Sequence, residues 1–421
     1  MLARLHDTHT SQWSTDVDEM RLRLGAPDNP TLFPPHFLKS TFPEIGGRVI
    51  EFFDGQTICG YGFLFPRSIE NGRRILTLRL HRIPETEFVF EADAQLLAEA
   101  LIPDCGIVIF DPSGDLDMPG NVLVPGDVEI GRPNAAEAEL LRQLQGRIWG
   151  SSSDLLYPSD IHATGFGTGA SLIARWNEQV AGFLFGFIRF DGSPLPDGWQ
   201  DVYRTDLRLE SQVLGADPNI RGQGVGSRLK RAQAELARQL DIDIVSWTVD
   251  PLQMPNAILN FGSLGAVCFG FHPNWYSFQN ELNQVPASRL AMTWLINSDR
   301  VVNGSRSERL IDLGKRPDII RLNDGPDQID DPASLAGATC AIEIPDDWTA
   351  LQSLDYERAF FWRQSTDRLL LALLGASDDR YMITSIARDG DRAYLIAERT
   401  AEVVARSHEA THQRAGASAV S

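Results

Sequence analysis

The densest group of residues able to do chemistry is a glycine-rich, basic segment in the middle of the chain. It reads DPNIRGQGVGSRLKR from Asp217 to Arg231 and carries Gly222, Gly224 and Gly226. Glycines let a backbone approach a ligand closely, and the first turn of a helix leaves N–H groups without partners. The dipole of such a helix favours anions at its start. The segment is therefore expected to bind a phosphate group.

The same segment concentrates positive charge in an otherwise acidic chain. The 421 residues include 57 Asp and Glu against 38 Lys and Arg, a formal net charge of -19. Such a balance repels phosphate backbones, so non-specific nucleic-acid binding is not expected. A polyanionic ligand must instead be held locally. The side chains predicted to face it are Arg221, Arg228, Lys230 and Arg231.

The spacing of the glycines separates several kinds of phosphate loop. A Walker loop requires G-x-x-x-x-G-K-[ST], which the segment lacks, and a dinucleotide fingerprint requires G-x-G-x-x-G, whereas this chain has G-x-G-x-G. A nucleotide-dependent oxidoreductase would also need a ribose-binding acidic residue about 20 positions on. The segment does match [RQ]-x-x-G-x-[GA] through Arg221, Gly224 and Gly226.

The loop must be positioned by the elements on either side of it. A strand is predicted to end where Asp217-Pro218 interrupts a ladder, and Val225, Leu229 and Leu236 lie on one helical face after the loop. The neighbouring hydrophobic patterns extend this order in both directions. The predicted elements are a helix over 134–149, a hairpin over 171–176 and 180–190, a strand over 207–216, a helix over 226–240, a strand over 243–249, a helix over 256–264 and a strand over 266–271.

This order of elements resembles the core of the GNAT N-acetyltransferase superfamily. The resemblance covers about residues 134–296, and LGADPNIRGQGVGSRLK is its specific centre. More narrowly, DPLQMPNAILNFGSLGAV and FHPNWYSF resemble a bacterial branch of predicted GNAT proteins with a C-terminal extension, here 341–398. The resemblance implies an α+β fold, with a central mixed, mostly antiparallel sheet flanked by helices.

The resemblance also implies an acetyl-CoA site, with acetyl-CoA as co-substrate. Strand residues would offer backbone groups to the pantetheine, the loop would hold the pyrophosphate, and one asparagine would meet the ligand from the following helix. The strand residues are Val213, Leu214, Gly215 and Ala216. The loop residues are Arg221, Gly222, Gln223, Gly224, Val225, Gly226 and Ser227, and the asparagine is Asn260.

The implied reaction is direct attack of an amine on the thioester. Glu210 lies eleven positions before Arg221, where the histone-acetylating branch of the superfamily places its base. It is the candidate base, or else a solvated carboxylate on a half-exposed strand. Many GNAT enzymes place a tyrosine acid in the helix after the fifth strand, but the matching residue here is Phe261. Tyr276 is the alternative acid, or else a packing aromatic.

The first part of the chain contains an echo of the middle part. Gly60, Phe63, Phe65 and Arg67 match Gly182, Phe185, Phe187 and Arg189, through duplication or through convergence of two aromatic hairpins. Stretches rich in Pro, Gly and Asp at 113–133 and 302–339 divide the chain. The predicted domains are a degenerate GNAT-like domain over 1–130, without a glycine loop, the acetyltransferase domain over 131–300, a small α+β extension over 301–406 and a flexible tail over 407–421.

The remaining features exclude several classes of protein. The four cysteines are scattered without metal-ligand spacing, and no apolar run approaches membrane-spanning length. No signal peptide is recognisable, so a cytoplasmic location is expected. The expected acceptor is a small-molecule amine, with no nucleic acid or membrane partner. The main alternative is a non-catalytic acetyl-CoA-binding or scaffold protein on the same fold, whereas a serine hydrolase has less support because G-x-S-x-G is absent.

Overall fold

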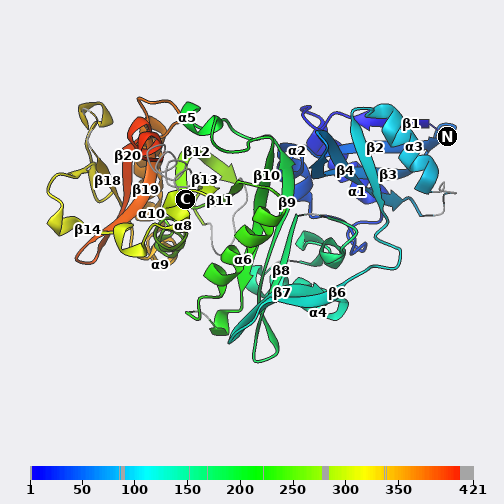
Figure 1. Ribbon diagram of the computed structural model, residues 1–421, viewed down its shortest axis with the longest axis horizontal. Helices are drawn as coiled ribbons and strands as arrows, with labels where there is room; N and C mark the ends of the chain where they lie inside the picture. Colours follow the sequence, from blue (N-terminus) through cyan, green and yellow to red (C-terminus); the bar gives the residue numbers. More distant parts are fainter. Residues whose placement is uncertain are drawn as a thin grey trace, which may run out of the picture. The chain divides into compact units, whose positions relative to one another are not determined.

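A computed structural model describes residues 2–84, 86, 91–150, 152–167, 169–220, 222–276, 284–335, 337 and 339–407. The described chain forms two compact units (Figure 1). Unit 1 contains residues 2–192 and 206–242, and unit 2 contains 193–205 and 243–407. The architecture is α+β with mixed sheets, as predicted. The domain boundaries near residues 130 and 300 stay a prediction.

The first sheet of unit 1 is built from the N-terminal third of the chain. Its strands follow the order β1-β2-β3-β4-β5, antiparallel except for the parallel pair β4 and β5, which α3 connects. The strands are β1 Leu2–His6, β2 Arg48–Asp54, β3 Thr57–Glu70, β4 Arg73–Arg82 and β5 Cys105–Phe110. The helices are α1 Trp13–Arg23, η1 Phe37–Thr41, α2 Phe42–Glu44 and α3 Glu91–Leu101.

The second sheet of unit 1 carries the glycine-rich loop. Its strands are antiparallel and follow chain order: β6 Pro119–Val124, β7 Val128–Asn134, β8 Gly169–Trp176, β9 Gln179–Phe190 and β10 Leu207–Ala216. The predicted hairpin and the strand before the loop are confirmed. The hairpin of β6 and β7 was missed, because β6 is a largely exposed edge strand that tolerates Pro119 and Gly120.

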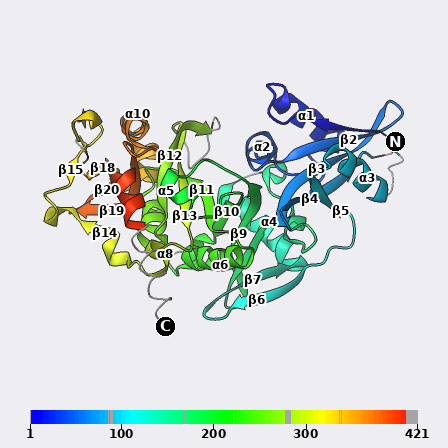
Figure 2. The same ribbon diagram turned by 45° about the horizontal axis from the view of Figure 1, so that its top comes forward.

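Helices cover both faces of this second sheet (Figure 2). Helix α4, Ala135–Trp149, starts with a capping box between Asn134 and Glu137 and buries Leu141 and Leu144 against the odd-numbered phenylalanines of β9. Helix α6, Val225–Gln239, covers the other face, where a Cβ at Gly182 would lie 2.9 Å from Val225 Cγ1. The short helices are η2 Ser153–Leu155, η3 Ser159–His162 and η4 Pro218–Ile220.

One aromatic core joins the N-terminal part of unit 1 to β8 and β9. The Phe37 and Phe187 ring centroids lie 4.8 Å apart, and the rings of Phe65 and Phe187 stack at 5.9 Å. Phe63 and Phe185 belong to the same buried cluster. The aromatic residues of the sequence echo therefore pack together in a shared core.

A buried arginine lies at the edge of this core. The Arg79 side chain of β4 has no exposed surface and forms an ion pair with Asp160 of η3. Its Nη2 donates to the Thr31 carbonyl oxygen at 2.5 Å, and its Nε donates to His81 Nε2 at 3.1 Å. The guanidinium also lies 5.2–5.5 Å from the ring centroids of Phe33, Phe110 and Phe166. These contacts attach the first sheet to the segment before β8.

The strands of unit 2 follow the order β15-β18-β20-β19-β12-β13-β11, with β14 parallel to β19. Its main strands are β11 Ile244–Val249, β12 Val267–Tyr276, β13 Ala287–Leu295, β18 Cys340–Ile344, β19 Tyr381–Asp389 and β20 Arg392–Arg399. Its main helices are α7 Met254–Ala257, η5 Ile258–Leu264, α9 Trp348–Leu354 and α10 Tyr356–Leu373. The shorter elements are α5 Asp197–Gln200, α8 Asp299–Val302, η6 Arg306–Glu308, β14 Leu310–Asp312, η7 Leu313–Lys315, β15 Ile320–Arg321, β16 Asn323–Asp324, β17 Gln328–Ile329 and η8 Pro332–Leu335.

We expect Asp160→Ala to lower the free energy of unfolding by about 3–5 kcal/mol, because it leaves the Arg79 charge buried without its carboxylate. The double variant Arg79→Met, Asp160→Ala should lose less, since no charge then stays uncompensated. Urea denaturation followed by circular dichroism measures both. A double variant less stable than the single one would contradict this account of the pair.

Candidate functional site

The glycine-rich loop presents a row of backbone N–H groups at the start of α6. Gly222 and Gly224 have φ values of +88° and +72°, in the left-handed region that favours glycine, and Gly224 is the N-cap of α6. The Arg228 N–H donates to the Gly224 carbonyl oxygen at 3.0 Å, which starts the helical ladder. Within the described chain, the N–H groups of Gly222, Gly224, Val225, Gly226 and Ser227 have no hydrogen-bond partner.

This arrangement can bind an anion. The glycines of the loop carry no side chain that would cover the N–H groups, and Gly222 and Gly224 are exposed. Arg228 is exposed beside them, and a Cβ at Gly126 would lie 3.6 Å from its Nη1. The turn between β6 and β7 therefore lies next to the loop, a contact that the sequence did not indicate. Arg221 lies outside the described residues.

Lys230 does not belong to the anion-facing group, contrary to the sequence prediction. Its residue surface is only 3% exposed, and its Nζ donates to Ser211 Oγ at 2.8 Å and to Gln233 Oε1 at 3.3 Å. Burial lowers the pKa of Lys230 well below its usual 10.5, while Glu210 acts in the opposite direction. The prediction was wrong because position 230 lies one turn beyond the loop, on the face of α6 that packs against the sheet.

The predicted base lies beside an irregularity in β10. Glu210 pairs with Phe187 of β9, and the register then shifts before Val213 pairs with Phe185. Gly186 makes room for this bulge, since a Cβ there would lie 2.5 Å from the Glu210 carbonyl oxygen. Beyond the bulge, residues 213–216 pair in register with β9.

The Glu210 carboxylate is only partly accessible. Its Oε2 lies 3.6 Å from Arg189 Nη1, and the two side chains are 14% and 20% exposed. Paired residues of antiparallel strands lie on the same face, so Glu210 shares the face of Phe187, on which the aromatic core lies. Ser211, on the bulge, contacts Lys230 from α6 on the other face. The bulge thus places neighbouring residues of β10 in two different environments.

Two predicted site residues belong to unit 2. Asn260 is 3% exposed and lies in the π-helical segment η5, a geometry frequent at functional sites. Phe261, at the position matched to a tyrosine, has no exposed surface and is a core residue. Tyr276 ends β12 opposite Ala287, and its side chain lies outside the described part of the structure.

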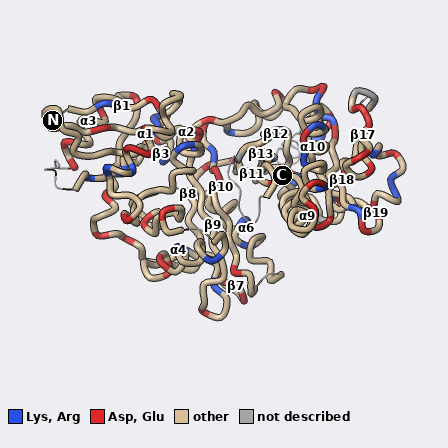
Figure 3. The backbone as a smooth tube through the Cα atoms, turned by 180° about the vertical axis from the view of Figure 1, so that it is seen from behind, with Lys and Arg blue, Asp and Glu red and all other residues tan. Residues whose placement is uncertain are grey.

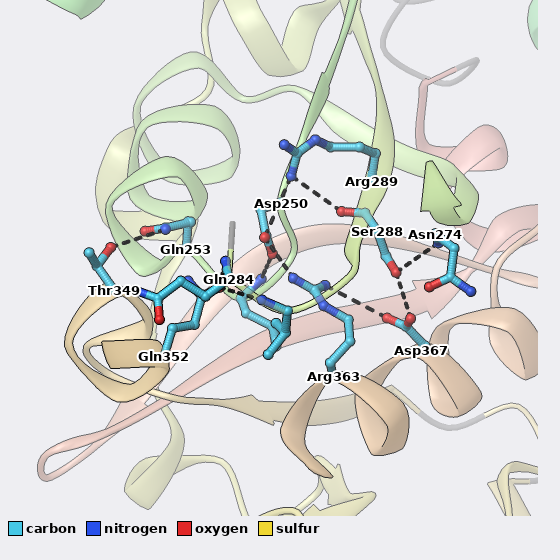
Figure 4. Close-up of polar contacts among 12 residues, drawn as sticks. Asp250, Gln253, Asn274, Gln284, Ser288, Arg289, Thr349, Gln352, Arg363 and Asp367 are labelled. Atoms are coloured by element: carbon cyan, nitrogen blue, oxygen red, sulfur yellow. Dashed lines mark hydrogen bonds and ion pairs between the residues drawn. The ribbon is translucent and has the colours of Figure 1, made fainter. Parts of the chain in front are cut away.

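A buried polar network in unit 2 holds the loop that leads to η5 (Figure 4). Arg363 Nη2 of α10 donates to Asp250 Oδ2 at 2.6 Å, and both side chains are less than 7% exposed. Asp250 Oδ1 accepts from the Leu252 N–H at 2.9 Å, which orders the turn after β11. Ser288 Oγ donates to Asp367 Oδ2 at 2.5 Å, and burial raises the pKa of Asp367. The sequence did not indicate this network.

The structure thus brings Glu210, residues 213–216 and residues 222–227 together in unit 1, on β10 and at the start of α6. Asn260 and Tyr276 fall in unit 2.

Basic and acidic residues are interspersed along the described backbone (Figure 3). Among the described residues, no group of three His, Cys, Asp or Glu could hold a metal ion. No described helix has the length and apolar character needed to cross a membrane.

Comparison with known proteins identifies the domain around this site. Residues 138–259 match the model of the acetyltransferase (GNAT) family. The match begins in α4, includes the whole glycine-rich loop and ends in η5. The chain therefore contains a GNAT acetyltransferase domain, as the sequence resemblance predicted. No curated protein matches the chain significantly.

Several solved structures are similar to this chain at low sequence identity. Ard1 from Thermoplasma volcanium has 18% identity, with 40% of this chain and 97% of that chain covered and a TM-score of 0.29. The putative acetyltransferase yncA from Salmonella typhimurium, solved with acetyl-CoA, has 14% identity, coverage of 41% and 95% and a TM-score of 0.31. Diaminobutyrate acetyltransferase EctA from Paenibacillus lautus has 15% identity, coverage of 42% and 99% and a TM-score of 0.29.

The buried Lys230 makes stability depend on pH. Its pKa is lower in the folded chain than in the unfolded chain, so the unfolded state binds more protons and stability is lost as pH falls below about 10.5. Lys230→Met should remove this dependence. Between pH 7 and pH 9 the free energy of unfolding of the variant should therefore rise less than that of the unmodified protein. The difference should be at most about 1.4 kcal/mol per pH unit.

Urea denaturation at several pH values measures this slope. Lys315→Met is the matched control, because the Lys315 side chain is 83% exposed. The control should retain the slope of the unmodified protein. An unchanged slope in Lys230→Met would show that the amine is charged inside the fold.

Proposed function

We propose that the protein is an N-acetyltransferase that transfers the acetyl group of acetyl-CoA to a primary amine of a small molecule. The observation that carries the proposal is the row of N–H groups at residues 222 and 224–227, unpartnered within the described chain and located inside the GNAT domain. Such a row fits a pyrophosphate, because each N–H can donate to a phosphate oxygen at the positive end of a helix.

The residues of unit 1 would divide the binding of acetyl-CoA between them. Gly222 to Ser227 would hold the pyrophosphate, with Gln223 in the same turn and Arg221 and Arg228 adding positive charge. Residues 213–216 would offer main-chain groups to the pantetheine, as alternate residues of an antiparallel strand direct these groups away from β9.

The proposed reaction is direct transfer in a ternary complex. Bound acetyl-CoA supplies an activated acetyl thioester. The amine nitrogen forms a bond to the carbonyl carbon, the carbon–sulfur bond breaks, and CoA leaves as a thiolate. A backbone N–H of β10 polarises the carbonyl oxygen. Glu210 takes the proton that the amine must lose, directly or through water.

The departing thiolate also needs a proton donor. The buried Phe261 has no proton to donate, which leaves Tyr276 as the proposed acid. A thiol with a pKa near 8.5 also leaves without strong protonation. The lack of a proton donor at Phe261 also favours the second candidate function, a non-catalytic acetyl-CoA-binding protein on the same fold. Amine acetylation separates the two.

The proposed domain organisation assigns this reaction to residues 131–300, in a cytoplasmic protein. Residues 1–130 would be a GNAT-like half without a glycine loop, and residues 301–406 an extension. The shared aromatic core supports a role for the first domain beside the acceptor, because it covers the face of β9 and β10 that carries Glu210.

We expect acetyl-CoA to bind the full chain with micromolar affinity and Gly224→Asp to weaken it at least about tenfold. The aspartate adds a negative charge among the N–H groups, each of which contributes about 1.5–3 kcal/mol when bonded to a charged group. Isothermal titration calorimetry measures the binding. Gly72→Asp is the matched control, because Gly72 also has a positive φ, +76°, and open space around it.

The control should bind acetyl-CoA as the unmodified protein does. Absence of binding to the folded, unmodified protein would overturn the acetyltransferase proposal. Equal weakening in both variants would show that the aspartate acts through general destabilisation rather than at the loop.

We expect Glu210→Gln to lower kcat for amine acetylation by about 100-fold, the lower end of what a positioned base contributes. Affinity for acetyl-CoA should be unchanged, because the carboxylate is not assigned to that ligand. CoA release, followed with a thiol reagent, measures turnover. Glu235→Gln, an exposed position on α6, is the control. An undiminished kcat in Glu210→Gln would show that Glu210 is a solvated carboxylate and not the base.

A further inference from the structure

The bulge of β10 lies between the proposed base and the proposed pantetheine-binding residues. Register pairing with β9 stops at Glu210 and resumes at Val213. The two residues between them, Ser211 and Gln212, share one opposite residue, Gly186. A bulge of this kind leaves one residue of the strand outside the ladder. The thioester of bound acetyl-CoA connects the pantetheine to the reacting amine, so its carbonyl is expected beside the bulge.

Lys230 holds the bulge from the α6 face of β10. Its Nζ donates to Ser211 Oγ at 2.8 Å and to Gln233 Oε1 at 3.3 Å. All three residues are at most 7% exposed. Gln233 lies next to the bulge, since a Cβ at Gly186 would lie 3.3 Å from its Nε2. The Lys230 amine therefore joins the bulge to α6, the helix whose start forms the glycine-rich loop.

Tyr157 holds the bulge from the opposite face. Gln212 Nε2 donates to Tyr157 Oη at 2.9 Å. Tyr157 is 5% exposed, and its ring centroid lies 4.8 Å from that of Phe185 in the aromatic core. The side chains of two consecutive bulge residues are thus bonded to buried groups on opposite faces of the sheet. These contacts restrict the movement of the bulge and of its backbone N–H groups.

We propose that Lys230 and Tyr157 are positioning residues, which fix the bulge so that one of its backbone N–H groups polarises the carbonyl of the bound thioester. The inference rests on the proposed function, because that reaction needs a donor at this place. Donors that stabilise a developing oxyanion must be in place before the reaction. Such precision, about 0.5 Å, comes from supporting residues that are themselves locked by packing and hydrogen bonds. Lys230 acts through Ser211, and Tyr157 acts through Gln212.

The test is difference infrared spectroscopy of the full chain with acetyl-CoA that is isotopically labelled at the acetyl carbonyl. Binding should move the carbonyl band below that of free acetyl-CoA, because an N–H donor polarises the bond. Tyr157→Phe and Lys230→Met should each lose at least about half of this shift. The Kd for acetyl-CoA, measured by calorimetry, should be unchanged, because both variants retain the glycine-rich loop. Tyr356→Phe and Lys315→Met, at exposed positions, are the matched controls and should keep the full shift.

Gln212→Met removes the contact with Tyr157 from its other end. It should lose as much of the carbonyl shift as Tyr157→Phe does. The double variant should lose no more than either single variant, because all three lack the same hydrogen bond. Two independent structural effects would add instead, so this comparison separates positioning through the bond from general destabilisation.

Two results would overturn the inference. The first is that the carbonyl band of bound acetyl-CoA does not shift in the unmodified protein, and the second is that Tyr157→Phe or Lys230→Met keeps the full shift. Failure of the proposed function gives a different result, because acetyl-CoA would then not bind to the folded chain. Binding with a shift that the variants do not change would leave an acetyl-CoA site whose carbonyl donor is held by other residues.

Discussion

The fold of unit 1 depends on one buried cation. The Arg79 guanidinium has no access to water, and such a charge is tolerated only with a counter-ion and hydrogen bonds. Asp160 supplies the counter-ion, Thr31 and His81 accept hydrogen bonds, and three phenylalanine rings line the guanidinium. These partners come from the segment between β1 and β2, from β4 and β5, and from the chain that follows the first sheet. The pair therefore forms only when the N-terminal part and the segment before β8 are packed together.

The two faces of β10 consequently contact different parts of unit 1. On one face the aromatic core packs against β9, with Val213 of β10 beside it. On the other face α6 seats Lys230 against Ser211 and presents its own N-terminus, with the glycines, at the end of the strand. The bulge after Glu210 is what allows both arrangements, because it interrupts the strict alternation of side chains along a strand.

Unit 2 also contains a buried arginine that is paired with an aspartate. Arg363 lies 5.1 Å from the centroid of the Trp348 ring and is paired with Asp250, which in turn orders the turn before α7. The π-helical segment that carries Asn260 follows directly, so the network positions this residue from a distance. Both units thus bury an arginine–aspartate pair under an aromatic ring, and neither pair has a local sequence signature.

The sequence by itself determined the strand, loop and helix around Gly224, because φ preferences and hydrophobic periodicity are local properties. It also predicted helix α4, the hairpin of β8 and β9 and, through its motif, the GNAT family. Only the tertiary structure decided that Lys230 is buried and that Arg79 joins two parts of the chain. These features depend on which distant segments meet, and burial of a charge is a property of its neighbours rather than of its position in the sequence.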